Sequence, residues 1–175
     1  MRGGWPLWML LVAGCAMEPE PPPEGPRIAF ADDFAGFRDW EAYRLPTDSL
    51  TDGHFSSDER WLYVDRPVPG LPASIPEGTI LVKTVEDGPL EEWTVHAMVH
   101  RGGGYNPDGC EGWEFFVLKL DADGEVYVDW RGTGDRGAVY IDPSGVSHSC
   151  NSCHLIAYDR DCVFSRELLA PSPTP

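Results

Sequence analysis

The sequence predicts an α+β fold that is mainly an antiparallel sheet of about five strands, with flanking helices and a C-terminal segment after the last strand. Segments rich in β-branched and aromatic residues recur along the chain, and Gly, Pro and Asp breaks separate them. These segments are Arg60–Asp65, Thr79–Glu86, Trp93–Arg101, Trp113–Leu120 and Glu125–Trp130. Before the first of these segments, apolar residues recur at helical spacing and predict a helix.

The stretch before the first strand has regularly spaced apolar residues, namely Phe34, Phe37, Trp40 and Tyr43. This spacing predicts a helix over Asp33–Tyr43, which Asp32 or Asp33 could cap. Farther along, residues 121–124 (DADG) have the composition of a hairpin turn between two of the strands.

The C-terminal segment contains a C-x-x-C-H motif at residues 150–154. This spacing is typical of c-type haem attachment, in which two thiols add to the haem vinyl groups and the adjacent imidazole ligates the iron. It predicts one covalent haem c bound by Cys150 and Cys153, with His154 as the iron ligand. The alternatives are a zinc site that includes His148 and a redox dithiol. The compact spacing suits tetrahedral zinc poorly, and nothing nearby is similar to a thioredoxin unit.

Three charged residues share strand faces with apolar residues, because side chains in a strand alternate with a period of two. Lys83 alternates with Leu81 and Val85, and apolar residues flank Glu114 and Arg60 in the same way. Burial of any one of these charges alone is costly. We therefore expect either that they form a polar pocket beside the haem, or that these faces are half exposed, with Lys83 and Glu114 at strand edges.

The N-terminus has the features of an export signal. Arg2 precedes a short apolar run over residues 5–12, which is too short to span a bilayer, and small residues precede Cys15. Residues 12–15 (VAGC) are similar to a bacterial lipobox, which predicts a signal peptide over residues 1–14 and a lipid on Cys15. An ordinary signal peptide is the alternative. Export agrees with the haem motif, since bacteria attach c-type haem outside the cytoplasm.

The rest of the chain divides by composition. Residues 15–30 are rich in Pro and Glu and predict an extended tether. We expect residues 31–166 to form one haem domain and residues 167–175 to form a disordered tail. We therefore expect the domain to face the periplasm from a lipid anchor in the bacterial cell envelope, at the outer membrane.

The charge balance bears on partners. The formal net charge is −16, from 29 acidic and 13 basic side chains, which disfavours nucleic-acid binding. The acidic surface could attract a basic redox partner such as a soluble cytochrome, or could simply be solvated. Of the 5 cysteines, Cys110 and Cys162 are left after the lipid and haem sites. In an oxidising compartment we expect these two to pair if the fold brings them together.

Several stretches together resemble the cytochrome P460 family, which also includes the beta-type cytochromes c-prime. Besides the haem motif, they are RWLYV at 60–64, GTILVK at 78–83, MVHRGGGYNP at 98–107, GWEFF at 112–116 and DCVFS at 161–165. The likeness covers residues from about 40 to 166. The order and spacing of these stretches are more specific than any one of them.

The resemblance implies a mainly antiparallel, homodimeric protein with a five-coordinate c-type haem. It implies that Lys83 matches a lysine cross-linked to the porphyrin edge in the enzymatic members, and that Arg60 matches a pocket arginine. A distal glutamate is the family's proton acceptor. Strand alternation favours Glu114 as its match, and spacing from the lysine favours Glu111.

The function that the resemblance implies is oxidation of hydroxylamine, with nitric oxide as an alternative partner, to nitrous oxide. Electrons would pass to an external acceptor, such as another cytochrome. One alternative is a protein that binds or senses nitric oxide without turnover. Another is an electron carrier with a sixth iron ligand from His96, Met98, His100 or His148.

Overall fold

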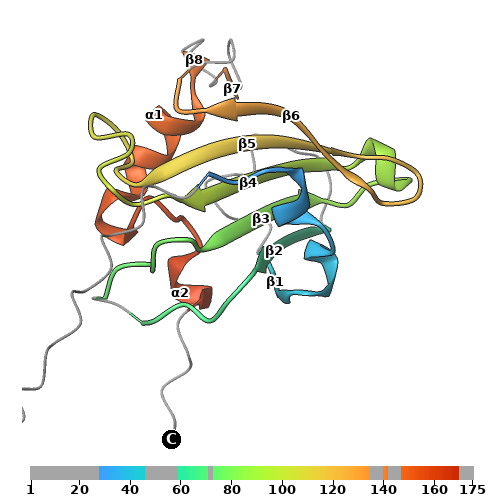
Figure 1. Ribbon diagram of the computed structural model, residues 1–175, viewed down its shortest axis with the longest axis horizontal. Coiled ribbons are helices and arrows are strands. Elements are labelled where there is room, and N and C mark those ends of the chain that lie inside the picture. Colours follow the sequence, from blue (N-terminus) through green and yellow to red (C-terminus); the bar gives the residue numbers. More distant parts are fainter. Residues whose placement is uncertain (1–27, 46–58, 71–72, 135–139, 142–146, 170–175) are drawn as a thin grey trace, which may run out of the picture.

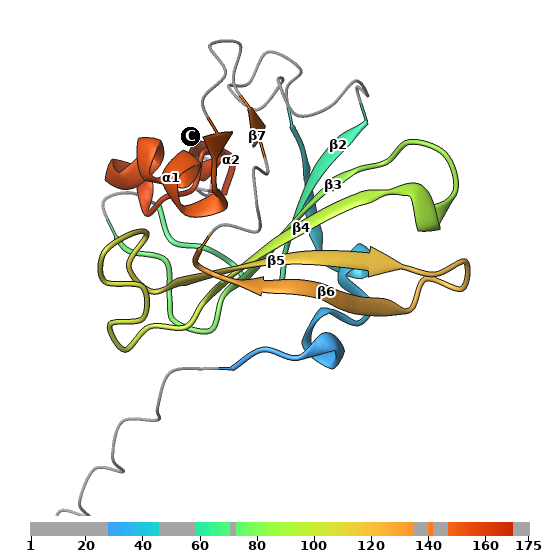
Figure 2. The ribbon, with the colours of Figure 1, turned by 90° about the horizontal axis from the view of Figure 1, so that it is seen from above.

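The computed structural model describes residues 28–45, 59–70, 73–134, 140–141 and 147–169. Its main element is an antiparallel sheet of six strands in sequence order (Figures 1 and 2). The strands are β1 (Glu41–Arg44), β2 (Arg60–Val64), β3 (Ile80–Val85), β4 (Thr94–His100), β5 (Trp113–Leu120) and β6 (Val126–Gly132). The described part of the chain is therefore mainly antiparallel β with short helices, as the sequence predicts.

All five predicted strands are present, and β1 is an additional edge strand that pairs with β2. The predicted hairpin turn is also present, because the Gly124 amide donates to the Asp121 carbonyl at 3.0 Å. The Asp121 carboxylate accepts from the amides of Asp123 and Glu125, which fixes the turn between β5 and β6.

The helix predicted over Asp33–Tyr43 is wrong. The segment forms two short 3₁₀ helices, η1 (Ala31–Phe34) and η2 (Phe37–Asp39), and then enters β1. Gly36, with a φ of 68°, breaks the chain between them. Three-residue spacing also fits the period of a 3₁₀ helix, so Phe34 and Phe37 are both buried without a continuous α-helix.

Two apolar cores lie on opposite faces of the sheet. One, here called the N-terminal face, is covered by the segment around η1 and η2, whose Phe34 and Phe37 pack against β2 to β5. The other, the C-terminal face, is covered by the segment that follows β6, which contributes Cys162, Val163 and Leu169. Figure 2 shows the blue N-terminal segment and the orange C-terminal helices on opposite sides of the sheet.

The C-terminal segment begins with a two-stranded sheet of β7 (Tyr140–Ile141) and β8 (Ser147–His148). Helix α1 (Cys150–His154), the 3₁₀ helix η5 (Leu155–Arg160) and helix α2 (Arg166–Leu169) follow. Ser149 caps α1, since its hydroxyl accepts from the Ser152 amide at 3.1 Å. The cap starts the helix at the first cysteine of the C-x-x-C-H motif.

Within the described residues, no helix combines the length and apolar character needed to cross a membrane.

Candidate functional site

The C-x-x-C-H motif forms helix α1 over the C-terminal face of the sheet. Cys150 packs against the core of that face, and both Cys150 and Cys153 are half-buried. Among the described residues, neither thiol takes part in a disulfide. The helix therefore presents two thiols and an imidazole from one short, capped element.

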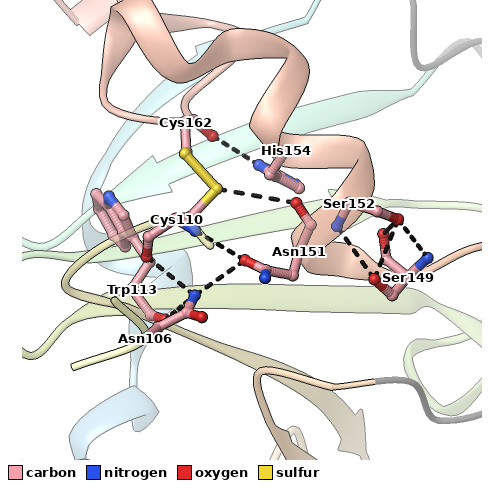
Figure 3. Close-up of a disulfide and its surroundings, with 8 residues drawn as sticks. All are labelled: Asn106, Cys110, Trp113, Ser149, Asn151, Ser152, His154 and Cys162. Carbon is pink, nitrogen blue, oxygen red and sulfur yellow. Dashed lines mark hydrogen bonds between the residues drawn. A yellow bond between two sulfur atoms is a disulfide. The ribbon is translucent and has the colours of Figure 1, made fainter. Parts of the chain in front are cut away.

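The orientation of His154 is set by a backbone carbonyl. Its Nδ1 lies 2.7 Å from the Cys162 carbonyl oxygen (Figure 3). A carbonyl can only accept, so Nδ1 carries a proton, and in the neutral ring Nε2 then carries the lone pair. This is the tautomer in which a histidine ligates a metal through Nε2 while its other nitrogen is held by an outer partner.

The His154 ring lies between two aromatic side chains. Its centroid is 5.1 Å from the ring of Phe115 on β5 and 5.3 Å from that of Phe164. Phe115 belongs to the core of the C-terminal face. The imidazole is thus held against the sheet by packing as well as by its hydrogen bond.

Lys83 lies on the same face of the sheet as this helix. Leu81, two residues earlier on β3, belongs to the C-terminal-face core, and side chains two apart share a face. Burial raises the pKa of the Cys153 thiol, and the Lys83 ammonium partly offsets this by lowering it. The amine on β3 therefore lies within electrostatic reach of Cys153, the second cysteine of the C-x-x-C-H motif.

Arg60 is a diagonal neighbour of Lys83 across β2 and β3. The register pairs Arg60 with Val85 and Leu62 with Lys83, so both charged side chains lie on the C-terminal face. Arg60 is only 3% exposed. The structure thus brings together two of the three charged residues that strand alternation singled out.

Glu114 does not join them, so the three-residue pocket, which was one of the two expected arrangements, is not formed. Its neighbours Trp113 and Phe115 belong to the C-terminal-face core, so alternation directs Glu114 to the N-terminal face. There its carboxylate accepts two bonds from Arg131, at 2.8 and 2.7 Å, and a longer one of 3.3 Å from Arg101. The carboxylate is a buried structural ion-pair partner on the face opposite Lys83.

Glu111, the other glutamate candidate, is exposed in the turn that leads to β5. It lines a hollow of about 390 Å³ together with His100 and Asp161. Lys83 and His154 are not among the residues that line this hollow. The described geometry therefore brings neither glutamate together with Lys83 and His154.

His96 is a residue whose place the sequence analysis missed. It is the direct cross-strand partner of Lys83 and is paired in turn with Val117 on β5. Because directly paired residues share a face, His96 lies beside Lys83 on the C-terminal face. The alternation of His96 with Met98 was visible in the sequence, but the register that pairs it with Lys83 was not.

Cys110 and Cys162 form a disulfide, with their Cα atoms 5.9 Å apart, which confirms the pairing expected for the two remaining cysteines (Figure 3). The bond joins the loop between β4 and β5 to the turn that follows η5. Cys162 is also the residue whose carbonyl binds His154. The disulfide is therefore part of the surroundings of the motif histidine.

The described part of the chain contains no set of side chains that would serve as zinc ligands. There, no three or more His, Cys, Asp or Glu side chains gather closely enough to hold one metal ion between them. The predicted signal peptide over 1–14, Cys15 and most of the 15–30 tether lie outside the described residues.

Comparisons of the chain with protein-family models, curated proteins and solved structures gave no match.

Proposed function

We propose that this protein is an exported c-type cytochrome in which Cys150 and Cys153 would hold one haem c and His154 Nε2 would ligate its iron. The observation that carries the proposal is that the two thiols, the imidazole and Lys83 meet on one face of the sheet. The Nδ1 hydrogen bond to Cys162 supports the ligating tautomer. The donor set therefore fits a covalently attached, histidine-ligated haem.

The apolar surroundings also fit the group. The C-terminal-face core supplies Leu62, Leu81, Met98 and Phe115, which offer an apolar wall beside α1. The charged side chains on the same face, Arg60 and Lys83, suit a cofactor that is apolar in its ring and anionic at its propionates. We assign Lys83 as the side chain at the porphyrin edge, which is the position that the family resemblance implies.

The reaction we propose is oxidation of hydroxylamine, with or without nitric oxide, to nitrous oxide. When bound, the haem would supply an open iron position and would take up the electrons of a small nitrogenous ligand. Hydroxylamine must release protons as well as electrons, so the protein has to provide a base. Phe115 and Phe164 pack against the His154 ring and make its surroundings apolar. The base must therefore come from another part of the C-terminal face.

We propose His96 as that base, in place of the glutamate that the resemblance implies. Its register position beside Lys83 puts a titratable imidazole on the correct face of the sheet. Glu114 is unsuited, since Arg131 and Arg101 hold its carboxylate on the other face. Neutral His96 would accept a proton from the bound ligand and pass it to solvent.

A second candidate function, nitric oxide binding without turnover, is favoured by the position of Glu114. A site without a nearby carboxylate can still bind a neutral diatomic ligand, because such binding needs no proton acceptor. The spectrum of the purified protein, produced with c-haem maturation, separates the two functions. A ferrous Soret band far to the red of ordinary c-type haem would support a Lys83 cross-link and hydroxylamine turnover.

An ordinary five-coordinate ferrous band would support nitric oxide binding instead. A low-spin six-coordinate spectrum would contradict both and support electron transfer with a sixth protein ligand. Protein without covalent haem would overturn the proposal as a whole. Nitrous oxide formation from hydroxylamine, with an oxidised cytochrome as the electron acceptor, completes the test.

The same proposal includes location and partners. We infer that the domain is lipid-anchored through Cys15 to the cell envelope and faces the periplasm, as a homodimer. The net charge of −16 supports a basic cytochrome as the electron acceptor. Labelling of cells with a radioactive fatty acid, with Cys15→Ser as the control, tests the anchor.

A further inference from the structure

The loop between β4 and β5 contacts the C-terminal segment on both sides of His154. Before the histidine, the loop binds Asn151, the first variable residue of the C-x-x-C-H motif. After the histidine, it is bonded through Cys110 to Cys162. Figure 3 shows both contacts, with His154 between them along the chain.

The contact at Asn151 is specific. Its Oδ1 accepts from the Cys110 amide at 2.9 Å and from Asn106 Nδ2, also at 2.9 Å. Gly109 also contributes to this contact, because a Cβ atom there would overlap the Asn151 amide. Asn106, Gly109 and Cys110 are here called the Asn151 seat. An asparagine fits the position because one oxygen with two lone pairs satisfies both donors.

Asn106 ties this seat to the sheet. Its Nδ2 also reaches the carbonyl oxygens of Cys110 at 3.0 Å and of Trp113, the first residue of β5, at 3.3 Å. Asn106 has a φ of 56°, a left-handed conformation that asparagine tolerates better than most residues. The loop is thus a fixed support for α1.

The contact at Cys162 sets the direction of a carbonyl. Asp161 and Cys162 are consecutive non-glycine residues with positive φ, at 55° and 60°. This unusual turn aims the Cys162 carbonyl back at His154 Nδ1. Non-glycine residues keep such a conformation only where their surroundings impose it, and here the disulfide and the bond from the Ile75 amide to Asp161 do so.

The sulfur of the disulfide reaches α1 as well. Cys110 Sγ lies 3.9 Å from the Asn151 carbonyl oxygen. This is a packing contact, because a disulfide sulfur carries no proton to donate. It places the disulfide directly between the helix that holds the motif and the turn that binds its histidine.

We propose that the Cys110–Cys162 disulfide and the Asn151 seat form a clamp that positions His154 toward the haem iron. The clamp holds the Cys162 carbonyl on Nδ1 and thereby fixes the rotation of the imidazole. This proposal rests on the proposed haem function, but it concerns residues that the haem motif itself does not specify. Cys110, Cys162 and Asn151 are positioning residues, and none of them touches the reacting ligand.

The test uses the haem-loaded full-length protein and the Cys110→Ala/Cys162→Ala double variant. Leu118→Ala is the matched control, since Leu118 is buried on the opposite face and its truncation also lowers global stability. Resonance Raman spectroscopy of the ferrous protein measures the iron–histidine stretching frequency. We expect it to fall and broaden in the double variant and to stay unchanged in Leu118→Ala.

A second measurement does not depend on the haem. The amides of Cys162 and Val163 donate to the carbonyls of Ala157 and Arg160, so their hydrogen exchange reports on the turn. We expect exchange over residues 155–166 to be at least about tenfold faster in the double variant than in Leu118→Ala. Asn151→Ala should show a smaller change in both measurements, and Asn151→Asp, which keeps an acceptor oxygen, should restore them.

The outcomes separate the two proposals. A haem-loaded double variant with the stretching frequency and exchange of Leu118→Ala would overturn the clamp and leave the haem site standing. Faster exchange with an unchanged stretching frequency would also overturn it, because the disulfide would then brace the turn without acting on the histidine. Wild-type protein without covalent haem would overturn the haem function, and with it any effect on the iron.

Discussion

Lys83 and Glu114 lie on opposite faces of one sheet. Lys83 shares its face with the C-x-x-C-H helix, whereas Glu114 is paired with Arg131 on the face that the N-terminal segment covers. This separation assigns a structural role to the glutamate and leaves the lysine on the same face as the C-x-x-C-H motif.

Glu114→Gln should destabilise the protein without changing its chemistry. The substitution keeps the side chain's size but removes the charge that holds Arg131 and Arg101. We expect the free energy of unfolding to fall by about 1–3 kcal/mol, discounted because Arg131 is partly exposed. Urea denaturation measures this, and exposed Glu111→Gln is the control. Loss of turnover at full stability would instead make Glu114 the catalytic base.

His96→Gln should remove the proposed base and leave the haem spectrum unchanged. General bases contribute roughly 10²–10⁴-fold to rate, so the rate of hydroxylamine oxidation should fall within that range. His100→Gln is the matched control, because His100 is on the same strand but lines the separate hollow. Equal rates in His96→Gln and wild type would refute the assignment.

His100 should make stability depend on pH. Burial lowers its pKa below the ordinary 6.5, only partly offset by Asp161 and Glu77. The folded state therefore binds a proton less readily than the unfolded state. The stabilising contribution is complete above pH 6.5 and is lost as the pH falls below 6.5 toward the folded pKa, with a slope of at most about 1.4 kcal/mol per pH unit.

Urea denaturation between about pH 7.5 and pH 5, a range that spans the ordinary histidine pKa, measures this slope. The wild type should lose more stability over this window than His100→Gln, which cannot titrate. Parallel stability curves for the two proteins would show that His100 does not contribute.

Gly109→Ala should disturb the seat of Asn151. The added methyl group would overlap the Asn151 amide, which must then give up its bonds to Asn106 and Cys110. We expect a loss of about 1–3 kcal/mol in the free energy of unfolding. Gly134→Ala is the control, because a Cβ atom there meets nothing within 4 Å. Equal thermal midpoints for the two variants would contradict the packing described.

The sheet was predictable because its strands carry dense β-branched and aromatic residues with a period of two. Strand β1 was missed because it is short and mostly exposed, with Tyr43 as its one partly buried apolar side chain. The helix over Asp33–Tyr43 was wrong because spacing by three does not separate an α-helix from 3₁₀ turns followed by a strand. Each error concerns a segment whose conformation tertiary packing decides.

The candidate site was predictable only in part. The C-x-x-C-H motif and the alternation within each strand identified Cys150, Cys153, His154, Lys83 and Arg60. Alternation also placed Glu114 correctly among its own strand neighbours, but it could not say which face the C-terminal segment covers. The pairing of Lys83 with His96 depends on strand register, and the approach of Cys110 to Cys162 depends on how two distant loops pack.

The proposed haem site is tested most directly by the intact mass of the denatured protein, expressed with c-haem maturation. We predict a mass increase of one haem that survives denaturation in the wild type and is absent from the Cys150→Ala/Cys153→Ala variant. Cys110→Ala/Cys162→Ala should keep the increase, because those thiols pair with each other. An unmodified wild-type mass, under conditions that load a control c-type cytochrome, would show that Cys150 and Cys153 do not bind haem.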